Sequence, residues 1–487
     1  MKSGGWLHLH NIVTYKKEQE MCGICGAFSQ NTIPVDFMVK QAVKVNHRGH
    51  EAVGLAQVSC DGQFNHFVGQ GLVRTACTAS NPKFCEFCDR AREIAPTAYI
   101  GHTRYSTVGP SDLAHGQPIG MCHPKFGQFY VVHNGQIPRH EVLRKELEAQ
   151  GQWFQTQSDT ETLAAVIAHS EATTLAGAVY DLVERVDGAF SIIAISDQHL
   201  VAARDAHGFW PLWYGFDGNG GVVFASEEPA LGRVYYRAEY IPAGTVVVSD
   251  KAGDEYGTKA QTVRRLERTH ACWLNAVYLS RPDEGIGSTA TMSNVRYALG
   301  GALADVCQVD VDMVVGVPDS GLDAMFGFAK KRGLSTEDWR AIVRNRFAPG
   351  RSFILPGQED RQDVIRDKHS VTMRMVHGKR VGVVDDTIVR SNTARILTQM
   401  LYEAGAMEVH WFIPAPPIRV CCWYGIHTPT LREVAAHGRD EKQIAHMIGA
   451  NSVTYLPLPV MLAVLERYNR YGWCTACVDG DYPIAVT

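Results

Sequence analysis

The sequence lacks any apolar run long enough to cross a membrane, because charged residues, Gly or Pro interrupt every hydrophobic stretch. Residues 1–21 also lack the uninterrupted apolar region of a signal peptide. A formal net charge of -4 over 487 residues gives no basis for non-specific attraction to nucleic acid or to a membrane surface. We therefore expect no nucleic-acid partner and no membrane. Internal repeats and low-complexity tracts are lacking as well.

Cysteine is not scarce, but its distribution excludes the disulfide framework of a small secreted protein. The chain has 13 cysteines, an odd number spread over its whole length. This usage suits a reducing compartment, and we expect a cytoplasmic protein in which some thiols are ligands. The length allows about two to three domains.

The patterns divide the chain into three parts. Residues 1–21 are expected to be a leader or propeptide, unless the start is mis-assigned and translation begins at Met21. Residues 22–255 alternate short apolar strands with Gly-rich turns, and the helices fall outside the strand runs, which predicts a layered α+β domain. Residues 265–487 alternate strand and helix, as in Val311–Val317 followed by a helix to Arg332. This predicts an α/β domain with a doubly wound parallel sheet, in which ligands bind outside the carboxyl ends of the strands.

Cys22, in Met21-Cys22-Gly23-Ile24-Cys25-Gly26, has a conditional chemistry. If processing leaves it as the first residue, its thiol is a nucleophile and its own α-amine, with a pKa of roughly 8, is a base. Taken alone, the hexamer is better explained by a packed, inert thiol.

A second motif runs from a buried strand, Val383-Val384, through Asp385-Asp386 into a hydroxyl-rich turn that opens a helix. Backbone N–H groups and hydroxyls at a helix N-terminus form a phosphate site, and adjacent carboxylates accept hydrogen bonds from ribose hydroxyls or help hold Mg²⁺. The alternative is an ordinary turn with solvated caps. The whole segment resembles the binding motif of type I phosphoribosyltransferases.

That resemblance implies roles for named residues. Asp385 and Asp386 would contact the ribose of phosphoribosyl pyrophosphate (PRPP) and, with Ser320, lie at the Mg²⁺. Residues 344–358 resemble the family's mobile loop, which closes over the substrate. The 5′-phosphate would be held by the turn, which comprises Thr387, Ile388, Val389, Arg390, Ser391, Asn392 and Thr393.

The amino-terminal half contains five motifs in order: 22–26, 46–51, 101–107, 133–135 and 158–161. They resemble the motif set of class II glutamine amidotransferases. The resemblance implies that Arg104 binds the α-carboxylate of glutamine and Asp159 its α-ammonium. Asn134 and the Gly135 N–H would stabilise the oxyanion formed when Cys22 attacks the side-chain amide.

Together, the two halves resemble the glutamine phosphoribosylpyrophosphate amidotransferase family from Cys22 to Pro483. The resemblance implies an N-terminal-nucleophile αββα sandwich followed by the phosphoribosyltransferase domain. It implies a pentosyltransferase that converts glutamine, PRPP and water to 5-phosphoribosylamine, glutamate and pyrophosphate, the first step of purine synthesis. Ammonia would pass internally, purine nucleotides would inhibit, and the chain would form a homo-oligomer. Two alternatives remain: a diverged amidotransferase with another phosphosugar acceptor, and a non-catalytic sensor of PRPP or nucleotides.

Cys474 and Cys477 form a Cys-x-x-Cys pair. By itself this pair could bind zinc, bind an iron–sulfur cluster, be redox-active or be inert. One branch of the family carries a [4Fe–4S] cluster, and the resemblance implies Cys272, Cys422, Cys474 and Cys477 as its ligands. Cys85 and Cys88 form another such pair without a counterpart, and we expect structural or free thiols there.

Several positions depart from the family pattern. Trp210 is found where the family usually has arginine, Asn275 where it has glutamate, Glu284 where it has serine and Ser391 where it has glycine. The 344–358 loop also differs from the family's mobile loop in residues and length. Because the changes gather at the PRPP motif and the domain border, we expect them to affect coupling, acceptor or feedback more than glutamine hydrolysis.

Overall fold

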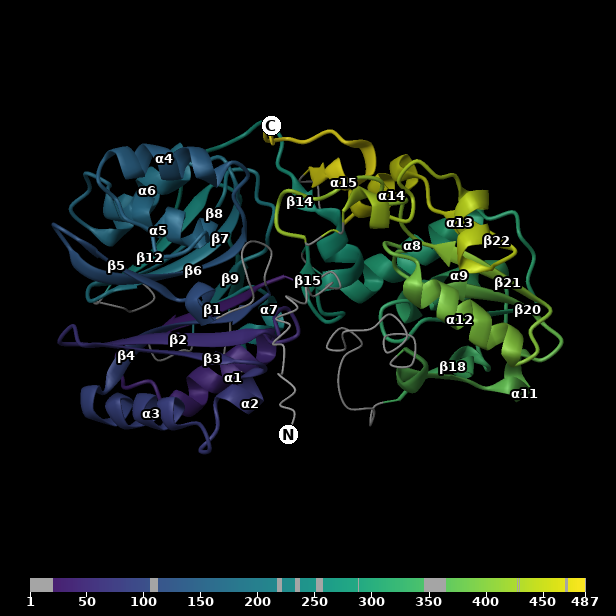
Figure 1. The fold of residues 1–487 in the computed structure, drawn as a ribbon, viewed down its shortest axis with the longest axis horizontal. Coiled ribbons are helices and arrows are strands. Elements are labelled where there is room, and N and C mark those ends of the chain that lie inside the picture. The colour runs from purple at the N-terminus through teal and green to yellow at the C-terminus, as the bar shows by residue number, and fades with distance from the viewer. Residues whose placement is uncertain are drawn as a thin grey trace, which may run out of the picture.

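The computed structural model describes residues 21–105, 113–216, 221–232, 237–250, 257–287, 289–345, 365–426, 428, 430–468 and 472–486. Two lobes lie side by side, the amino-terminal one in purple and blue and the carboxy-terminal one in green and yellow (Figure 1). The expected leader, apart from Met21, and most of the 344–358 loop lie outside the described residues.

The first lobe contains two antiparallel sheets packed face to face. The first sheet has the order β11 (Arg237–Tyr240), β9 (Trp213–Phe216), β10 (Val222–Ala225), β1 (Gly23–Phe28), β4 (Pro96–Arg104), β2 (Ala52–Ser59), β3 (Phe64–Gln70). The second has the order β13 (Thr258–Thr262), β12 (Thr245–Asp250), β8 (His199–Arg204), β7 (Ala189–Ser196), β6 (Gly127–Gln136), β5 (Ile119–His123). Alternate side chains such as Ile24, Ile100, Val132 and Ile193 form the buried layer between them. The second sheet continues to Thr262, beyond residue 255.

Helices cover both outer faces, α4–α6 above and α1–α3 below in Figure 1. The result is the αββα sandwich that the motifs predict. Their bounds are α1 (Val35–Val45), α2 (Val73–Ala76), α3 (Pro82–Ile94), α4 (His140–Ala149), α5 (Asp159–Ala168) and α6 (Leu175–Arg185); η1 (Leu113–His115) and α7 (Glu228–Leu231) are short.

The second lobe is built on a parallel sheet of β17 (Met313–Gly316), β20 (Arg380–Val384), β21 (Glu408–Ile413) and β22 (Ser452–Tyr455). Successive side chains of β21 point to opposite faces. Phe412 stacks on Phe328 of α9 (Leu322–Arg332), with ring centroids 4.8 Å apart. Trp411 donates from Nε1 to Thr398 Oγ1 of α12 (Asn392–Glu403) at 2.8 Å. Helices therefore cover both faces, as a doubly wound sheet requires.

The remaining elements surround this sheet or lie between the lobes. β14 and β23 pair in parallel with Cys272 opposite Cys474, which brings the end of the chain back to the lobe border. No helix among the described residues is long and apolar enough to span a membrane. The bounds are β14 (Ala271–Cys272), η2 (Asn275–Leu279), β15 (Gly285–Ile286), β16 (Ala290–Thr291), α8 (Met292–Val306), η3 (Trp339–Ala341), β18 (Ile342–Arg344), β19 (His369–Val371), α11 (Met373–Val376), η4 (Leu431–Glu433), α13 (Glu441–Ile448), α14 (Leu458–Leu465), β23 (Trp473–Cys474) and α15 (Ala476–Asp479).

The two lobes share one hydrophobic core. Ala189, Phe209 and Trp210 of the first lobe belong to the same buried cluster as Trp273 and Tyr424 of the second. Because this cluster runs on without a break into the packing around β17–β22, the lobes are joined by a dry interface rather than by a linker alone.

Helices α8 and α9 approach each other through glycines. A Cβ on Gly300 would lie 1.9 Å from the carbonyl oxygen of Ala324, and one on Gly327 would lie 1.9 Å from that of Tyr297. Gly301, next along α8, has only the Gly327 oxygen at 3.8 Å. The close approach therefore depends on Gly300 and not on its neighbour.

We predict that Gly300→Ala lowers the free energy of unfolding by about 1–3 kcal/mol, because the helices must separate. Gly301→Ala is the matched control and should be neutral or stabilising by up to about 1 kcal/mol, since alanine favours helix. Urea denaturation followed by circular dichroism measures both. Equal effects of the two substitutions would contradict the close packing at Gly300.

Candidate active sites

Cys22 immediately precedes β1 and is buried, with 9% of its surface exposed. Its Sγ lies 3.4 Å from the carbonyl oxygen of Tyr105, to which it donates, and 3.5 Å from the backbone N–H of Tyr105. Burial raises the pKa of the thiol to about 11, an effect opposed by Arg104 and reinforced by Asp159 and Glu51. At neutral pH the thiol is protonated, so its use as a nucleophile requires a nearby base.

Arg104 and Asp159 are both buried and both act electrostatically on Cys22. Arg104 ends β4. Asp159 begins α5, whose N-cap Ser158 accepts from the Thr160 N–H. The Asp159 Oδ2 accepts from the backbone N–H of Ile137 at 3.1 Å. The structure thus brings one cation and one anion of the predicted glutamine site together beside the thiol.

Asn134 and Gly135 lie near the end of β6. Asn134 is fully buried, and within the described chain neither its Nδ2 nor its Oδ1 has a hydrogen-bond partner. An unpaired buried amide costs about 1–3 kcal/mol, so such groups call for a ligand or water. Gly135 has φ 145°, and a Cβ there would lie 1.9 Å from the carbonyl oxygen of Ala189. Only glycine fits at this point of the strand.

Arg48 contacts the main chain of the nucleophile, a role that the motif alone does not reveal. Its Nε donates to the Cys22 carbonyl oxygen at 3.2 Å, and a terminal nitrogen donates to Glu227 Oε1 at 2.6 Å. His47 Nε2 reaches the same oxygen at 3.0 Å. Burial raises the pKa of Glu227, but His47 and Arg48 outweigh it and the net shift is downward.

Glu284 of the second lobe lies close to Glu227 of the first. It accepts from Trp213 Nε1 at 3.2 Å through Oε1. In the described residues, the Oε2 atoms of Glu227 and Glu284 have no hydrogen-bond partner although both are buried. Burial, and then the charge of Glu227, raise the pKa of Glu284 to about 8, against the favourable effect of Arg48. The lobe border therefore contains a carboxyl group that is protonated at neutral pH.

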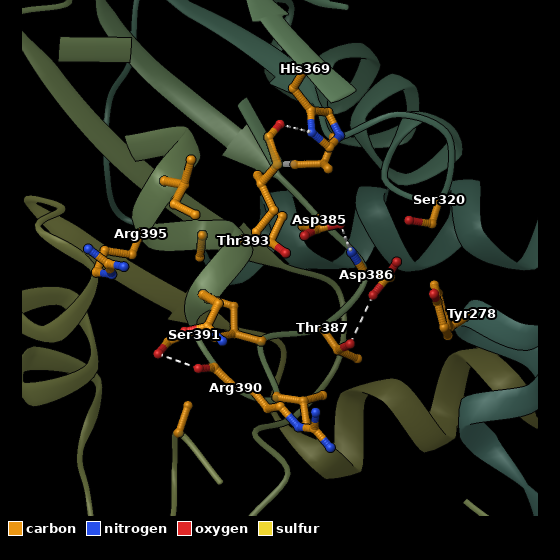
Figure 2. Close-up of a pocket in the computed structure, with 18 of the residues that line it drawn as sticks. Tyr278, Ser320, His369, Asp385, Asp386, Thr387, Arg390, Ser391, Thr393 and Arg395 are labelled. Carbon is orange, nitrogen blue, oxygen red and sulfur yellow. Dashed lines mark hydrogen bonds between the residues drawn. The ribbon is translucent and has the colours of Figure 1, made fainter. Parts of the chain in front are cut away.

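The second site is a pocket of about 680 Å³ at the carboxyl ends of β17 and β20, a volume typical of small-molecule sites. Figure 2 shows its residues converging from the turn after β20, the loop after β17 and η2. It is lined by all of the predicted PRPP and Mg²⁺ residues, namely Ser320, Asp385, Asp386, Thr387, Ile388, Val389, Arg390, Ser391, Asn392 and Thr393.

The two aspartates are buried side by side, and each has a raised pKa, chiefly because burial disfavours the charged form. Asp385 is raised further by the charge of Asp386. Hydrogen bonds from Ser320 and Thr387 and the positive charge of Arg296 oppose the shift at Asp386. Such a pair is suited to a cation or to hydroxyl donors, which would compensate its charge.

Ser391, which stands where the pattern has glycine, adopts the left-handed conformation with φ 65°. A residue with a Cβ costs roughly 1–2 kcal/mol there. The turn therefore keeps its glycine-like backbone although the glycine is gone. Motif reasoning missed further pocket residues, because they come from segments with no distinctive pattern: Tyr278, Lys368, Arg432 and Arg439.

The four predicted cluster cysteines line one small cavity of about 20 Å³ at the lobe border. Its wall also includes Trp210, Trp273 and Tyr424. The pKa values of Cys272, Cys474 and Cys477 are raised by burial first and then by neighbouring thiols of the set. In the part of the chain that the structure describes, no group of three or more His, Cys, Asp or Glu is arranged to hold a metal ion. The four thiols thus line the same cavity but are not arranged to coordinate one metal ion.

Cys85 and Cys88 lie on α3, far from this cavity in the sequence, and are unpaired thiols. Burial, and then the charge of Cys88, raise the pKa of Cys77 to about 12.

Comparison with known proteins gives consistent matches. A family model described as a glutamine amidotransferase domain matches residues 89–277. Amidophosphoribosyltransferase 2 of Arabidopsis thaliana is 34% identical over 475 residues, 97% of this chain and 81% of that protein. The amidophosphoribosyltransferases of Bacillus subtilis and Archaeoglobus fulgidus are each 33% identical, over 98% and 96% of this chain and 96% and 98% of their own lengths.

Two solved structures match almost the whole chain. The glutamine PRPP amidotransferase of Bacillus subtilis, complexed with ADP and GMP, superimposes with a TM-score of 0.82 at 31% identity, covering 96% of this chain and 98% of that one. A structure described as the allosteric regulatory enzyme of purine biosynthesis superimposes with a TM-score of 0.83 at 32% identity, covering 96% of this chain and 97% of that one.

The raised pKa of Glu284 predicts a pH-dependent stability. Between its ordinary pKa of 4.5 and its folded value of about 8, the folded chain holds a proton that the unfolded chain has lost. The free energy of unfolding therefore falls as pH rises through this window. We expect Glu284→Gln to flatten that fall, as measured by urea midpoints across it. Glu93→Gln, on the surface of α3, is the control and should keep the wild-type slope; an unchanged slope in Glu284→Gln would contradict the assignment.

Proposed function

The chain belongs to the amidophosphoribosyltransferase family, and on that premise we propose that Cys22 releases ammonia from glutamine for use in the pocket at Asp385 and Asp386. The family's reaction is a glutamine-dependent pentosyl transfer, the first step of de novo purine synthesis. The observation that carries the assignment is that Ser320 and residues 385–393 line a single pocket, while Arg104 and Asp159 act on Cys22 in the other lobe.

In the glutamine half, the Cys22 thiol attacks the side-chain amide carbon and loses its proton to the α-amine of the same residue. Arg104 binds the substrate carboxylate and Asp159 its ammonium. The unpaired Asn134 Nδ2 and the Gly135 N–H receive the oxyanion. The protonated amine then protonates the leaving ammonia, and water releases glutamate from the thioester. This base exists only in a chain whose first residue is Cys22.

In the PRPP half, the turn 387–393 and the N-terminus of α12 hold the 5′-phosphate, and Asp385 and Asp386 accept from the ribose hydroxyls. The family uses Mg²⁺, and the buried carboxylate pair with the Ser320 hydroxyl fits it. Mg²⁺ held by these groups would supply positive charge to the departing pyrophosphate. Ammonia adds to C1 of the ribose, the bond from C1 to pyrophosphate breaks, and the new C1-ammonium loses a proton to solvent to give 5-phosphoribosylamine.

For the four cysteines, we propose a [4Fe–4S] cluster rather than zinc. The donor set is four thiols around one cavity, which suits iron–sulfur, and among the described residues they are not placed for one ion. A cavity of about 20 Å³ holds roughly one water, so the side chains must separate when the cluster is bound. Cys272, Cys422, Cys474 and Cys477 would be the ligands.

Regulation by purine nucleotides is proposed from the relative that was solved with ADP and GMP. The basic residues around the pocket, such as Arg432 and Arg439, suit phosphate groups of either substrate or nucleotide. We also propose a homo-oligomer in a reducing, cytoplasmic setting, in which the cysteines stay unpaired.

We expect Cys22→Ala to reduce glutamine-dependent synthesis of phosphoribosylamine by a factor on the order of 10³ or more, because the nucleophile is lost. Synthesis from ammonium chloride and PRPP should remain within about twofold, since the second pocket is untouched. Pyrophosphate release measures both reactions. Cys25→Ala, three residues along β1, is the control and should keep both.

Mass spectrometry of the active protein should show Cys22 as the first residue. Full glutamine-dependent activity of a chain that still begins at Met1, or of Cys22→Ala, would contradict the proposed mechanism.

For the cluster, we expect anaerobically purified protein to contain about four iron atoms per chain, with visible absorption from thiolate-to-iron charge transfer. Cys477→Ser should lose iron and absorption. Cys421→Ser should keep both, because Cys421 adjoins Cys422 but does not line the cavity. Iron-free wild-type protein, or equal loss in both variants, would contradict the assignment.

A further inference from the structure

The oxyanion residue Gly135 is in contact with the opposite lobe. A Cβ on Gly425, in the loop after Cys422, would lie 3.2 Å from both the Cα and the carbonyl carbon of Gly135. Gly425 has φ 119°, so its backbone is in a region that favours glycine. The loop therefore approaches the end of β6 as closely as a residue without a side chain permits. Ala189 of β7 also approaches Gly135, since a Cβ on Gly135 would lie 1.9 Å from the Ala189 carbonyl oxygen.

Trp210 holds the Gly425 loop in this position. Its indole Nε1 donates to the carbonyl oxygen of Tyr424 at 2.7 Å and lies 3.2 Å from the Cβ position of Gly425. Trp210 is fully buried, and this hydrogen bond crosses between the lobes. The Tyr424 ring stacks on Phe209 at 4.5 Å, and its hydroxyl donates to the Ile484 carbonyl oxygen at 2.9 Å. These contacts hold the loop against the first lobe.

The backbone of Trp210 is tied to the same strands that carry the oxyanion residues. Its carbonyl oxygen accepts from Ser191 Oγ at 3.0 Å and from Arg204 Nε at 2.6 Å. Ser191 of β7 stands opposite Asn134 in the strand register. Trp210 thus binds the loop of the second lobe through its indole. Through its carbonyl oxygen it binds β7, the strand that pairs with Asn134.

We propose that Trp210, Tyr424 and Gly425 form an interlobe clamp that sets the position of the Gly135 N–H, making Trp210 a positioning residue for glutamine hydrolysis. The inference rests on the proposed role of Cys22, Asn134 and Gly135. Its physical basis is that an oxyanion donor works only within a few tenths of an ångström of its ideal place, and misplacement by about 1 Å costs roughly 10²-fold in rate. Glutamine hydrolysis then depends on the docking of the second lobe, whereas chemistry in the PRPP pocket does not depend on Gly135.

Gly425→Ala tests the clamp by pushing a methyl group against Gly135. The expected result is a fall of about 10- to 100-fold in kcat for glutamate release, with the KM for glutamine within about twofold, since Arg104 and Asp159 still bind the substrate. Synthesis from ammonium chloride should be unchanged. Gly438→Ala is the matched control: Gly438 also has positive φ, 65°, but nothing lies within 4 Å of its Cβ position. It should leave both activities unchanged.

Trp210→Phe removes the indole donor while keeping an aromatic ring, and should lower the same kcat about tenfold without affecting ammonia-dependent synthesis. An unchanged kcat in Gly425→Ala, or a parallel loss of both activities in both variants, would overturn the clamp. A wild-type enzyme that uses ammonia but releases no glutamate would instead overturn the proposed function of Cys22.

Discussion

The dry contact between the two lobes is the constraint on which the rest of the structure depends. Each lobe contains one of the two candidate sites, and the proposed internal transfer of ammonia requires a joint from which water is excluded. The shared core around Phe209, Trp210, Trp273 and Tyr424 provides such a joint. It also places Gly425 against Gly135, so the packing that unites the lobes reaches the glutamine site itself.

Charge is buried at this joint as well as hydrocarbon. Arg48 binds the Cys22 carbonyl and Glu227, and Glu284 meets Glu227 from the other lobe. Two buried carboxyl groups can lie this close because Glu227 is paired with Arg48 and Glu284 keeps its proton. Across the second lobe, Arg296 contributes positive charge toward Asp386. The substituted residues Asn275 and Glu284 meet in this region: the Asn275 amide donates to Ser280 Oγ, and Ser280 also hydrogen-bonds Glu284.

Short linear motifs were predictable because their chemistry is local. The turn after Val384 needs consecutive N–H groups and hydroxyls, and the end of β6 needs Asn134 next to a glycine, so each leaves its residues adjacent in the sequence. Strand and helix periodicity predicted a layered α+β domain followed by a parallel sheet, and the family resemblance implied that the first domain is an αββα sandwich. The left-handed Ser391 was not, because the surrounding turn, and not the serine, imposes its φ of 65°.

By itself, the sequence indicated the family with its reaction, the order of the two domains and the motifs whose residues are the candidates for binding glutamine and PRPP. Only the tertiary structure decided what lies between them: the Arg48–Glu227–Glu284 group, the basic rim with Arg432 and Arg439, and the Trp210 contact with Tyr424. Trp210 and Tyr424 alone are 214 positions apart, and these residues belong to no common motif. Their effects arise from distance and from loss of water, and neither quantity exists until the lobes have packed together.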